Sequence, residues 1–323
     1  LANHGAELYE AAEAAGVDLL FEAAVAGAIP IMRPLRESLA GEPITRVMGI
    51  VNGTTNFILS RMADDGVSYA DALAEAQGLG YAERDPTADV EGFDAGAKAA
   101  VIATVAFGAR VVAGDVYHEG ISGITVADIE FAADLQHCIK LLAVVEQTRA
   151  SDGGLQIGVR VHPTLVPLDH PLASVRGSFN AVFVEGGASG DLMFYGRGAG
   201  GRPTASAVLG DLIDAAGNLR RGHGAPIGAL ERARIAPIDD VTSAFYLNVE
   251  VDDRPGVLAQ VATVFGENGV SIRSMEQEGL GGEARLVFIT HAAKERDLRS
   301  TLQGLRSLDA VRAVGSVLRV IGD

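Results

Sequence analysis

The chain of 323 residues is 48% hydrophobic and 21% charged, a balance typical of soluble globular proteins with two or three domains. Its net charge of −16 argues against a nucleic-acid partner, because phosphate binding requires clustered lysine and arginine. The longest apolar run, at residues 99–109, is too short to cross a bilayer, and with no signal peptide visible the cytoplasm is the expected compartment. The single cysteine, Cys138, excludes an internal disulfide, and its apolar surroundings predict a buried, inert thiol.

In chain order, the first half predicts helices interrupted by two strands. Residues 4–15 have helical spacing ended by Gly16, and residues 17–25 read as a buried strand. A strand at residues 44–53 is stopped by the Asn52-Gly53 turn signal. The other helices are expected within residues 29–40, 54–66, 68–80 (capped by Ser68), 93–109 and 128–148.

The second half predicts a sheet and then a separate small domain. Strands of a mostly antiparallel sheet are expected at residues 155–167, 177–187 and 191–201, and a helix follows at residues 202–218. Beyond a Gly- and Pro-containing linker, the pattern becomes strand, helix, strand, strand, helix, strand. That order is typical of a ferredoxin-like domain.

Asp94 and Lys98 lie four residues apart in the expected helix at residues 93–109, so their side chains share one face. Most of that helix is alanine, valine, isoleucine, glycine and phenylalanine. A lysine on a buried helix requires a carboxylate partner, and such a lysine can be tuned toward proton transfer. The spacing therefore fits a structural ion pair and a catalytic pair equally well.

Glu83 and Asp89 lie in the charged loop that enters this helix. An acceptor just before a helix start can cap free N–H groups, so Asp89 is either a cap or a site residue. Glu83 follows Gly80 and Tyr81 and has no obvious capping role. A carboxylate beside a tyrosine suits recognition of an ammonium group, and the alternative is a plain surface residue.

Two further segments could bind ions. Glu22 ends an expected strand, and the small residues after it leave backbone carbonyls free to converge on a hard cation. A single carboxylate suits Na⁺ better than Ca²⁺. The run GRGAGG, residues 196–201, precedes a helix that is expected to start near Pro203, and such an entry either holds a phosphate or serves as a turn. The sequence contains no complete dinucleotide-binding fingerprint.

Several long motifs, taken together, resemble homoserine dehydrogenase. In chain order they are GIVNGTTNFILSRM, GYAERDPTADVEGFDAGAKAAVIA, HPTLVPLDHPLA, FNAVFVEG, LMFYGRGAGGRPTASAV and DDRPGVLAQVA. They extend across nearly the whole chain and are too long to match by chance. The resemblance implies an oxidoreductase, dependent on NADP or NAD, that interconverts L-aspartate 4-semialdehyde and L-homoserine in threonine, methionine and isoleucine biosynthesis.

The resemblance also implies roles for individual residues. Lys98 matches the lysine that exchanges a proton with the substrate oxygen, and Asp94 matches its acidic partner. An ammonium group near that oxygen stabilises the developing negative charge and supplies the proton. The other implied site residues are Glu83, Asp89, Tyr81 and Thr54 for the substrate, Gly80 and Gly198 for the cofactor, and Glu22, Val25, Gly27 and Ile29 for Na⁺.

The implied fold class is α/β and α+β. The expected parts are a remnant of a Rossmann nucleotide-binding domain at residues 1–28, a mixed α/β catalytic and dimerisation domain at 29–197, a helix returning to the nucleotide-binding domain at 198–220, a linker at 221–243 and a C-terminal ferredoxin-like ACT domain at 244–323. Because the family begins with a Rossmann unit carrying the Gly-rich fingerprint, we expect roughly 100 upstream residues to be missing.

The ACT resemblance predicts regulation. Asp253, Pro255 and Gly256 enter a helix where such modules bind an amino acid between paired copies, and L-threonine is the expected effector. The alternative is a module that only dimerises. The family implies a homodimer or homotetramer with small-molecule substrates and without nucleic-acid or membrane partners. A second hypothesis is a truncated, non-catalytic oligomer that binds an amino acid through its ACT domain.

Overall fold

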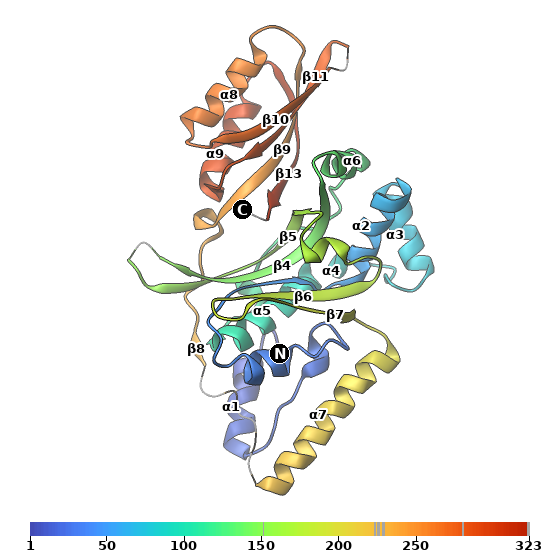
Figure 1. Cartoon of the computed structure of the whole chain (residues 1–323), viewed down its shortest axis with the longest axis vertical. Coiled ribbons are helices and arrows are strands. Elements are labelled where there is room, and N and C mark those ends of the chain that lie inside the picture. The colour runs from blue at the N-terminus through green and yellow to red at the C-terminus, as the bar shows by residue number, and fades with distance from the viewer. Residues whose placement is uncertain (151, 223, 225–226, 228–229, 280, 322–323) are drawn as a thin grey trace. The chain divides into compact units, whose positions relative to one another are not determined.

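The computed structural model describes residues 1–150, 152–222, 224, 227, 230–279 and 281–321 (Figure 1). The chain forms two compact units. The first unit comprises Leu1–Val126, Lys140–His162 and Leu168–Ala236, and the second comprises Ala127–Ile139, Pro163–Pro167 and Pro237–Asp323. Within the described ranges, no helix combines the length and apolarity that crossing a membrane would require.

The first unit is built around an antiparallel sheet. Its strands are β1 (Ile44–Ile50), β4 (His137–Arg149), β5 (Leu155–Pro167), β6 (Phe179–Gly186) and β7 (Gly190–Arg197), with the short strands β2 (Ala109–Arg110), β3 (Tyr117–His118) and β8 (Glu231–Arg232). Its helices are α1 (Gly5–Ala15), α2 (Gly53–Asp65), α3 (Tyr69–Gly78), α4 (Thr87–Val90), α5 (Phe93–Phe107) and α7 (Gly201–Arg221), with the short turns η1 (Glu22–Ala24), η2 (Pro34–Ser38), η3 (Ala113–Asp115) and η4 (Pro171–Ser174). The long strands follow the order β5-β4-β1-β6-β7. The predicted antiparallel strands are confirmed.

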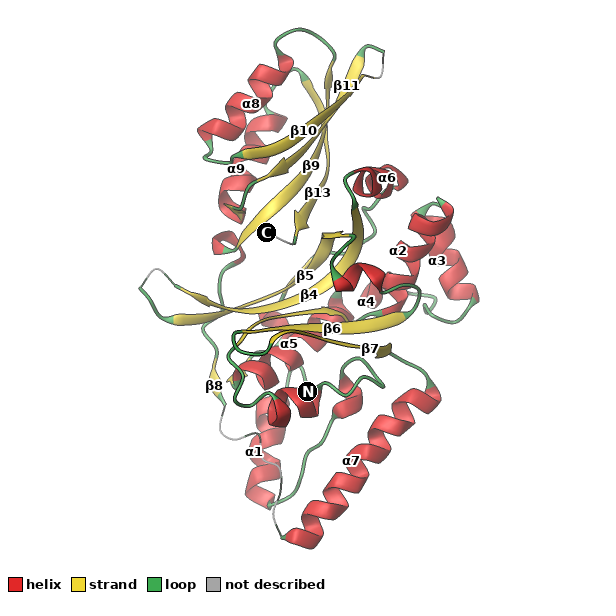
Figure 2. Cartoon of the chain, in the orientation of Figure 1, coloured by secondary structure: helices red, strands yellow, loops and turns green. Residues whose placement is uncertain are grey.

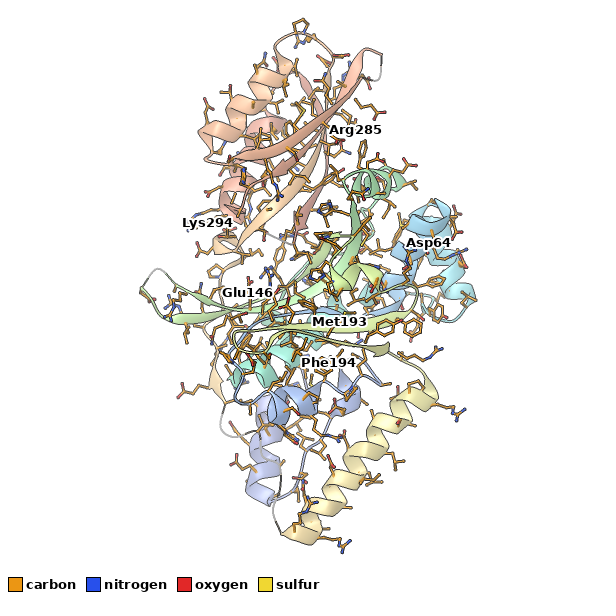
Figure 3. The ribbon with its side chains drawn as sticks, viewed as in Figure 1. Asp64, Glu146, Met193, Phe194, Arg285 and Lys294 are labelled. Carbon is orange, nitrogen blue, oxygen red and sulfur yellow. The ribbon has the colours of Figure 1, made fainter. Side chains whose placement is uncertain are left out.

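Strand β1 lies at the centre of this sheet because apolar side chains occupy both of its faces. Met48 lies opposite Val144 of β4 on one side and Phe183 of β6 on the other. Strand β7 follows β6 in a hairpin, in which Met193 of β7 pairs with Phe183 of β6. Met193 is labelled in Figure 3. The carboxyl end of β1 passes directly into α2, and this junction contributes to the site described below.

Helix α5 carries the charged pair and is otherwise buried for most of its length. It begins after Gly92 in the left-handed conformation, at φ +83°, and ends at Gly108, also left-handed. Ala99, Ala100 and Ala103 are fully buried along it. Small side chains let this helix pack closely, so its charged groups lie close to the backbone of neighbouring segments.

Two sequence predictions in the first half of the chain are wrong. Residues 17–25 form no strand, and the segment ends instead in η1. Residues 128–148 are not one helix, because helix α6 (Val126–Asp134) ends and β4 begins at His137. β4 is buried on both faces from Ile139 to Val145, and such a continuous apolar run does not distinguish a strand from a helix. Cys138 lies in β4 and is only half-buried, contrary to the expectation of a buried thiol.

The second unit has the predicted ferredoxin-like order. It contains β9 (Thr242–Asp252), α8 (Val257–Glu267), β10 (Ile272–Gly279), β11 (Glu283–Thr290), β12 (Ala293–Lys294), α9 (Glu295–Arg306) and β13 (Val311–Val320), with α6 and the short turn η5 (Ile238–Asp240). Alternate residues of β9 pack against α8 and α9, which lie together on one face of the sheet in Figure 2. Part of the predicted linker, at residues 223, 225, 226, 228 and 229, lies outside the described residues.

Candidate active site

The ammonium group of Lys98 points inward between a helix and the end of a strand. Its Nζ donates hydrogen bonds to Asp94 Oδ2 at 2.7 Å and to the backbone carbonyl of Val51 at 2.9 Å. The Lys98 side chain is 22% exposed, so the group is sheltered but reachable from solvent. An ammonium has three donors. With two of them bound to protein among the described residues, the third is available to an oxygen of a ligand.

Asn52, at the junction of β1 and α2, joins the two carboxylates of this site. It is 5% exposed, and its Nδ2 donates to Asp89 Oδ1 at 2.7 Å and to Asp94 Oδ2 at 2.9 Å. Its Oδ1 accepts the backbone N–H of Thr55 at 2.9 Å, so the same side chain caps α2. In the sequence, Asn52 is recognisable only as the first residue of the Asn52-Gly53 turn signal. The preference of asparagine for the position before a helix was the signal that could have identified it.

Asp89 is half-buried on α4, and its carboxylate faces Asn52. The capping alternative for this residue is wrong, because Gly92 precedes α5 and no side chain caps that helix. Burial raises the pKa of the Asp89 carboxyl above its ordinary value, and the charges of Asp94 and Glu83 add to this, while the hydrogen bond from Asn52 opposes it. The balance between the ionised and protonated forms of Asp89 therefore depends on these neighbouring groups.

The loop before α4 brings the remaining predicted substrate residues near this group. Thr54 Oγ1 donates to the backbone carbonyl of Tyr81 at 2.7 Å, which ties the loop to the start of α2. The Tyr81 ring is 45% exposed and lies 5.0 Å from that of Phe57. Glu83 is exposed, and its charge still influences the pKa of Asp89. Gly80, at φ +78°, has open space where a side chain would project.

The predicted cofactor glycine, Gly198, lies in a tightly packed turn after β7. A Cβ at Gly198 would fall 2.1 Å from the side-chain amide of Asn180, and a Cβ at Gly27 would fall 2.3 Å from the carbonyl oxygen of Gly198. The backbone N–H of Ala28 donates to the carbonyl of Arg197 at 3.1 Å. The two loops therefore touch through their backbones, and only glycine fits at the contact.

Replacing Gly27 by alanine is expected to lower the free energy of unfolding by about 3 kcal/mol, since it adds a backbone clash to a left-handed residue. The matched control is Gly16→Ala, which has a similar φ of +64° and no atom within 4 Å of the new Cβ. That variant is expected to cost only about 1 kcal/mol. Chemical denaturation followed by circular dichroism measures both, and equal losses would show that the contact with Gly198 does not matter.

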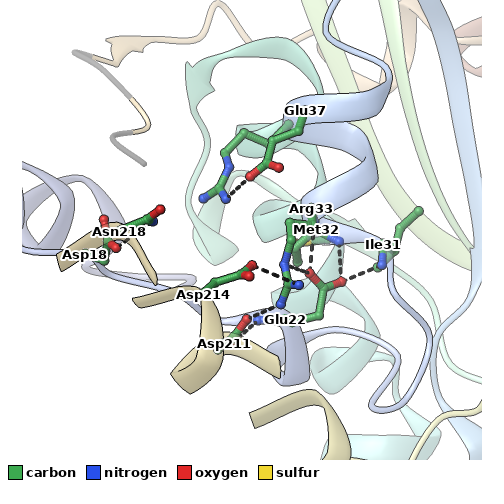
Figure 4. A network of polar contacts seen from close by, with 10 residues as sticks. Asp18, Glu22, Ile31, Met32, Arg33, Glu37, Asp211, Asp214 and Asn218 are labelled. Carbon is green, nitrogen blue, oxygen red and sulfur yellow. Dashed lines mark hydrogen bonds and ion pairs between the residues drawn. The ribbon is translucent and has the colours of Figure 1, made fainter. Parts of the chain in front are cut away.

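Glu22 is the hub of a polar network in the first unit (Figure 4). Its buried carboxylate accepts the backbone N–H groups of Ile31 at 2.5 Å, Met32 at 2.8 Å and Arg33 at 2.9 Å. The Arg33 guanidinium lies 3.7 Å from the same carboxylate and also pairs with Asp211 of α7 at 2.8 Å. Both Glu22 oxygens are thus engaged by N–H donors, so a cation at this loop would rely on carbonyl oxygens.

The predicted cation loop that follows Glu22 is sharply bent. Ala26 and Gly27 both have φ of +54°, which is uncommon for a residue other than glycine. The backbone carbonyls of Val25, Gly27 and Ile29 accept no backbone hydrogen bond from the described residues. A cation at this loop would therefore meet carbonyl oxygens that no backbone N–H among the described residues occupies.

The predicted effector residues form an exposed loop at the start of α8. Gly256 precedes the helix in a left-handed conformation, at φ +91°, and no side chain caps the helix. The backbone N–H of Asp253 donates to the carbonyl of Gly282 at 3.2 Å, which anchors the loop beside β11. Asp253, Pro255 and Gly256 are all exposed. The N-terminus of α8 is open to solvent at this loop.

A sheltered lysine held by an acidic partner is typical of an enzyme that transfers a proton to or from its substrate, and the chain also contains a second, ferredoxin-like unit. Residues 30–213 match the model of the family described as homoserine dehydrogenase, and residues 245–310 match that of the ACT domain. The chain belongs to the homoserine dehydrogenase family, whose members are NAD(P)-dependent oxidoreductases of amino-acid biosynthesis, and it carries an ACT regulatory domain.

Individual relatives agree with this assignment over almost all of the chain. The homoserine dehydrogenase of Corynebacterium glutamicum is 56% identical over 100% of this chain and 73% of its own length. That of Mycobacterium tuberculosis H37Rv is 52% identical over 100% of this chain and 75% of its own. A crystal structure of the enzyme from Thiobacillus denitrificans matches with a TM-score of 0.92 and 40% identity over 98% of this chain and 73% of that chain. The structure of a hyperthermophilic archaeal homoserine dehydrogenase mutant in complex with NADPH matches with a TM-score of 0.56 and 33% identity. The match covers 67% of this chain and 60% of that chain.

Proposed function

We propose that Lys98 and the carboxylates around it catalyse the interconversion of L-homoserine and L-aspartate 4-semialdehyde. The observation that carries this proposal is the position of the Lys98 ammonium, which is fixed by Asp94 and Val51 and keeps one donor free. In the reducing direction Lys98 gives a proton to the aldehyde oxygen as the carbon–oxygen double bond becomes an alcohol. In the oxidising direction the neutral amine takes that proton back. A positioned proton donor of this kind contributes about 10²–10⁴-fold to the rate.

NAD(P)H, when bound, supplies the hydride that the aldehyde carbon receives. We assign Gly80 and Gly198 to the cofactor side of the site, because Gly80 leaves open space and Gly198 excludes any side chain. The archaeal relative in complex with NADPH supports the choice of nucleotide class.

We also assign residues 1–28 and 198–220 to a nucleotide-binding domain. Helix α7 has no buried residue, and its apolar side chains at Leu209 and Leu212 are more than half exposed, as expected of a helix that packs against further polypeptide.

We assign Asp89 and Glu83 to the ammonium group of the substrate, with Tyr81 and Thr54 shaping the loop between them. The two carboxylates lie close enough for the charge of Glu83 to influence the pKa of Asp89. Holding the amino end fixes the distance between the reacting carbon and Lys98, which is the usual advantage of orienting a small substrate.

Replacing Asp89 by asparagine is expected to weaken L-homoserine binding about tenfold or more, because a charged hydrogen bond to the ammonium is lost. Titration calorimetry with L-homoserine measures this directly. Asp85→Asn is the matched control, since Asp85 lies in the same loop, is exposed and bonds only to Thr87 among the described residues. Equal affinities for the two variants would contradict the assignment of Asp89.

The remaining assignments concern ions, effectors and assembly. We infer that Na⁺ binds the carbonyls of Val25, Gly27 and Ile29 while Glu22 holds the loop in shape. Replacing Na⁺ by a bulky organic cation should then lower the Tm.

We infer that L-threonine binds at Asp253, Pro255 and Gly256, and that the chain forms a cytoplasmic homodimer or homotetramer. Calorimetry tests the binding of threonine, and light scattering tests the oligomeric state. If threonine binds but neither homoserine nor NADPH does, the chain is instead a non-catalytic amino-acid-binding oligomer.

A further inference from the structure

Asn52 lies between two residues of the proposed site, but none of the roles proposed above is its own. Its side-chain amide is fully used, since Nδ2 bonds both Asp89 and Asp94 and Oδ1 accepts from Thr55. Asp94 Oδ2 accepts from Asn52 and from Lys98 at the same time. One neutral side chain therefore connects the group proposed to bind the substrate with the group that holds the proton donor.

We propose that Asn52 is a positioning residue, whose amide holds Asp89 and Asp94 side by side so that one faces the substrate ammonium and the other faces Lys98. This proposal rests on the roles assigned to Asp89 and Lys98 under the proposed function. Asn52 need not touch the substrate, and it acts through the two carboxylates.

The physical reason is the mutual repulsion of two carboxylates in a sheltered place. The charged groups that influence Asp89 are Asp94 and Lys98 on α5 and Glu83 in the preceding loop, with the dipolar amide of Asn52 at the end of β1. Two of the three charges are negative and favour protonation of Asp89. The amide and Lys98 favour the ionised form. Removing the amide donors shifts this balance, and a protonated Asp89 no longer attracts an ammonium group.

Asn52→Ser separates positioning from stability, because serine is an equally good cap for α2 but cannot reach both carboxylates. The expected result is a Tm close to that of the unchanged enzyme. In the reducing direction Lys98 acts in its protonated form, so the acid limb of the pH profile of kcat/KM for L-aspartate 4-semialdehyde reports ionisation of Asp89. That limb should move upward by about one pH unit, the equivalent of one lost hydrogen bond to a charged group. The shift is upward because losing the donor raises the pKa of Asp89, so that its ionised form disappears at a higher pH.

Ser68→Ala is the matched control for a lost cap. Ser68 caps α3 by accepting from the backbone N–H of Asp71 at 3.2 Å, and it is exposed. This variant should lower the Tm by about 2–4 °C while its pH profile stays in place. Asn52→Ala should show both effects, namely the lower stability and the moved acid limb.

The outcomes also separate this proposal from the proposed function. An unmoved acid limb in Asn52→Ser, together with weakened homoserine binding in Asp89→Asn, would overturn the role of Asn52 alone. Unchanged binding in Asp89→Asn would overturn the substrate assignment itself. The positioning role would be supported if the acid limb of the kcat/KM profile shifts in Asn52→Ser and does not shift in Ser68→Ala.

Discussion

Lys98→Met is expected to lower kcat at least 100-fold in both directions of the reaction while leaving the fold intact. Methionine keeps most of the volume and apolar contacts of the side chain but cannot exchange a proton, and a general acid or base contributes about 10²–10⁴-fold. The fold should survive because the Lys98 side chain is partly exposed and Asp94 keeps its bond to Asn52. Initial rates from the absorbance of the reduced nicotinamide measure the effect, and circular dichroism verifies the fold.

Lys294→Met is the matched control for that prediction. Lys294 lies in the second unit, where it precedes α9 (Figure 3), and has no part in the proposed chemistry. Without effector, this variant should retain the rate of the unchanged enzyme. If Lys98→Met kept more than a tenth of that rate, proton exchange by Lys98 would be excluded.

Glu22→Ala is expected to lower the free energy of unfolding by about 3–5 kcal/mol, the largest stability loss that we predict for a single side chain. The substitution leaves three backbone N–H groups, those of Ile31, Met32 and Arg33, without their acceptor. It also removes a buried carboxylate from the Arg33 guanidinium. Denaturation followed by circular dichroism is the suitable measurement, because the chain contains no tryptophan.

Asp214→Ala tests whether the loss comes from the buried acceptors or from the ion pair with Arg33. Asp214 pairs with the same guanidinium at 2.9 Å, but its side chain is 42% exposed. Exposed ion pairs typically contribute 0–1 kcal/mol, so this variant should cost about that much. Similar losses for Glu22→Ala and Asp214→Ala would mean that the backbone contacts of Glu22 contribute little.

The parts of the fold that follow from neighbouring residues were predictable from the sequence. Gly16 ends α1 and Ser68 caps α3 as expected, because these signals act within one helical turn. The pairing of Asp94 with Lys98 follows from their spacing of four residues. The order of elements in the ferredoxin-like unit was predictable for the same reason.

The features that depend on distant segments were not predictable in this way. Asn52 meets Asp89 and Asp94 across 37 and 42 residues, and the backbone N–H of Glu22 meets Asp211 across 189. Local spacing carries no information about such contacts. A related cause explains the wrong strand at residues 17–25 and the wrong helix at 128–148. The periodicity of a short apolar run does not distinguish a strand from a helix, because the choice depends on the distant segments that pack against it.

The most direct test of the central claim is a crystal structure of the enzyme with L-homoserine bound. The proposed chemistry requires the substrate hydroxyl oxygen to lie within hydrogen-bonding distance, about 2.7–3.2 Å, of Lys98 Nζ. The substrate ammonium should lie against the carboxylates of Asp89 and Glu83. Homoserine bound elsewhere, with the Lys98 ammonium still contacting only Asp94 and Val51, would contradict it.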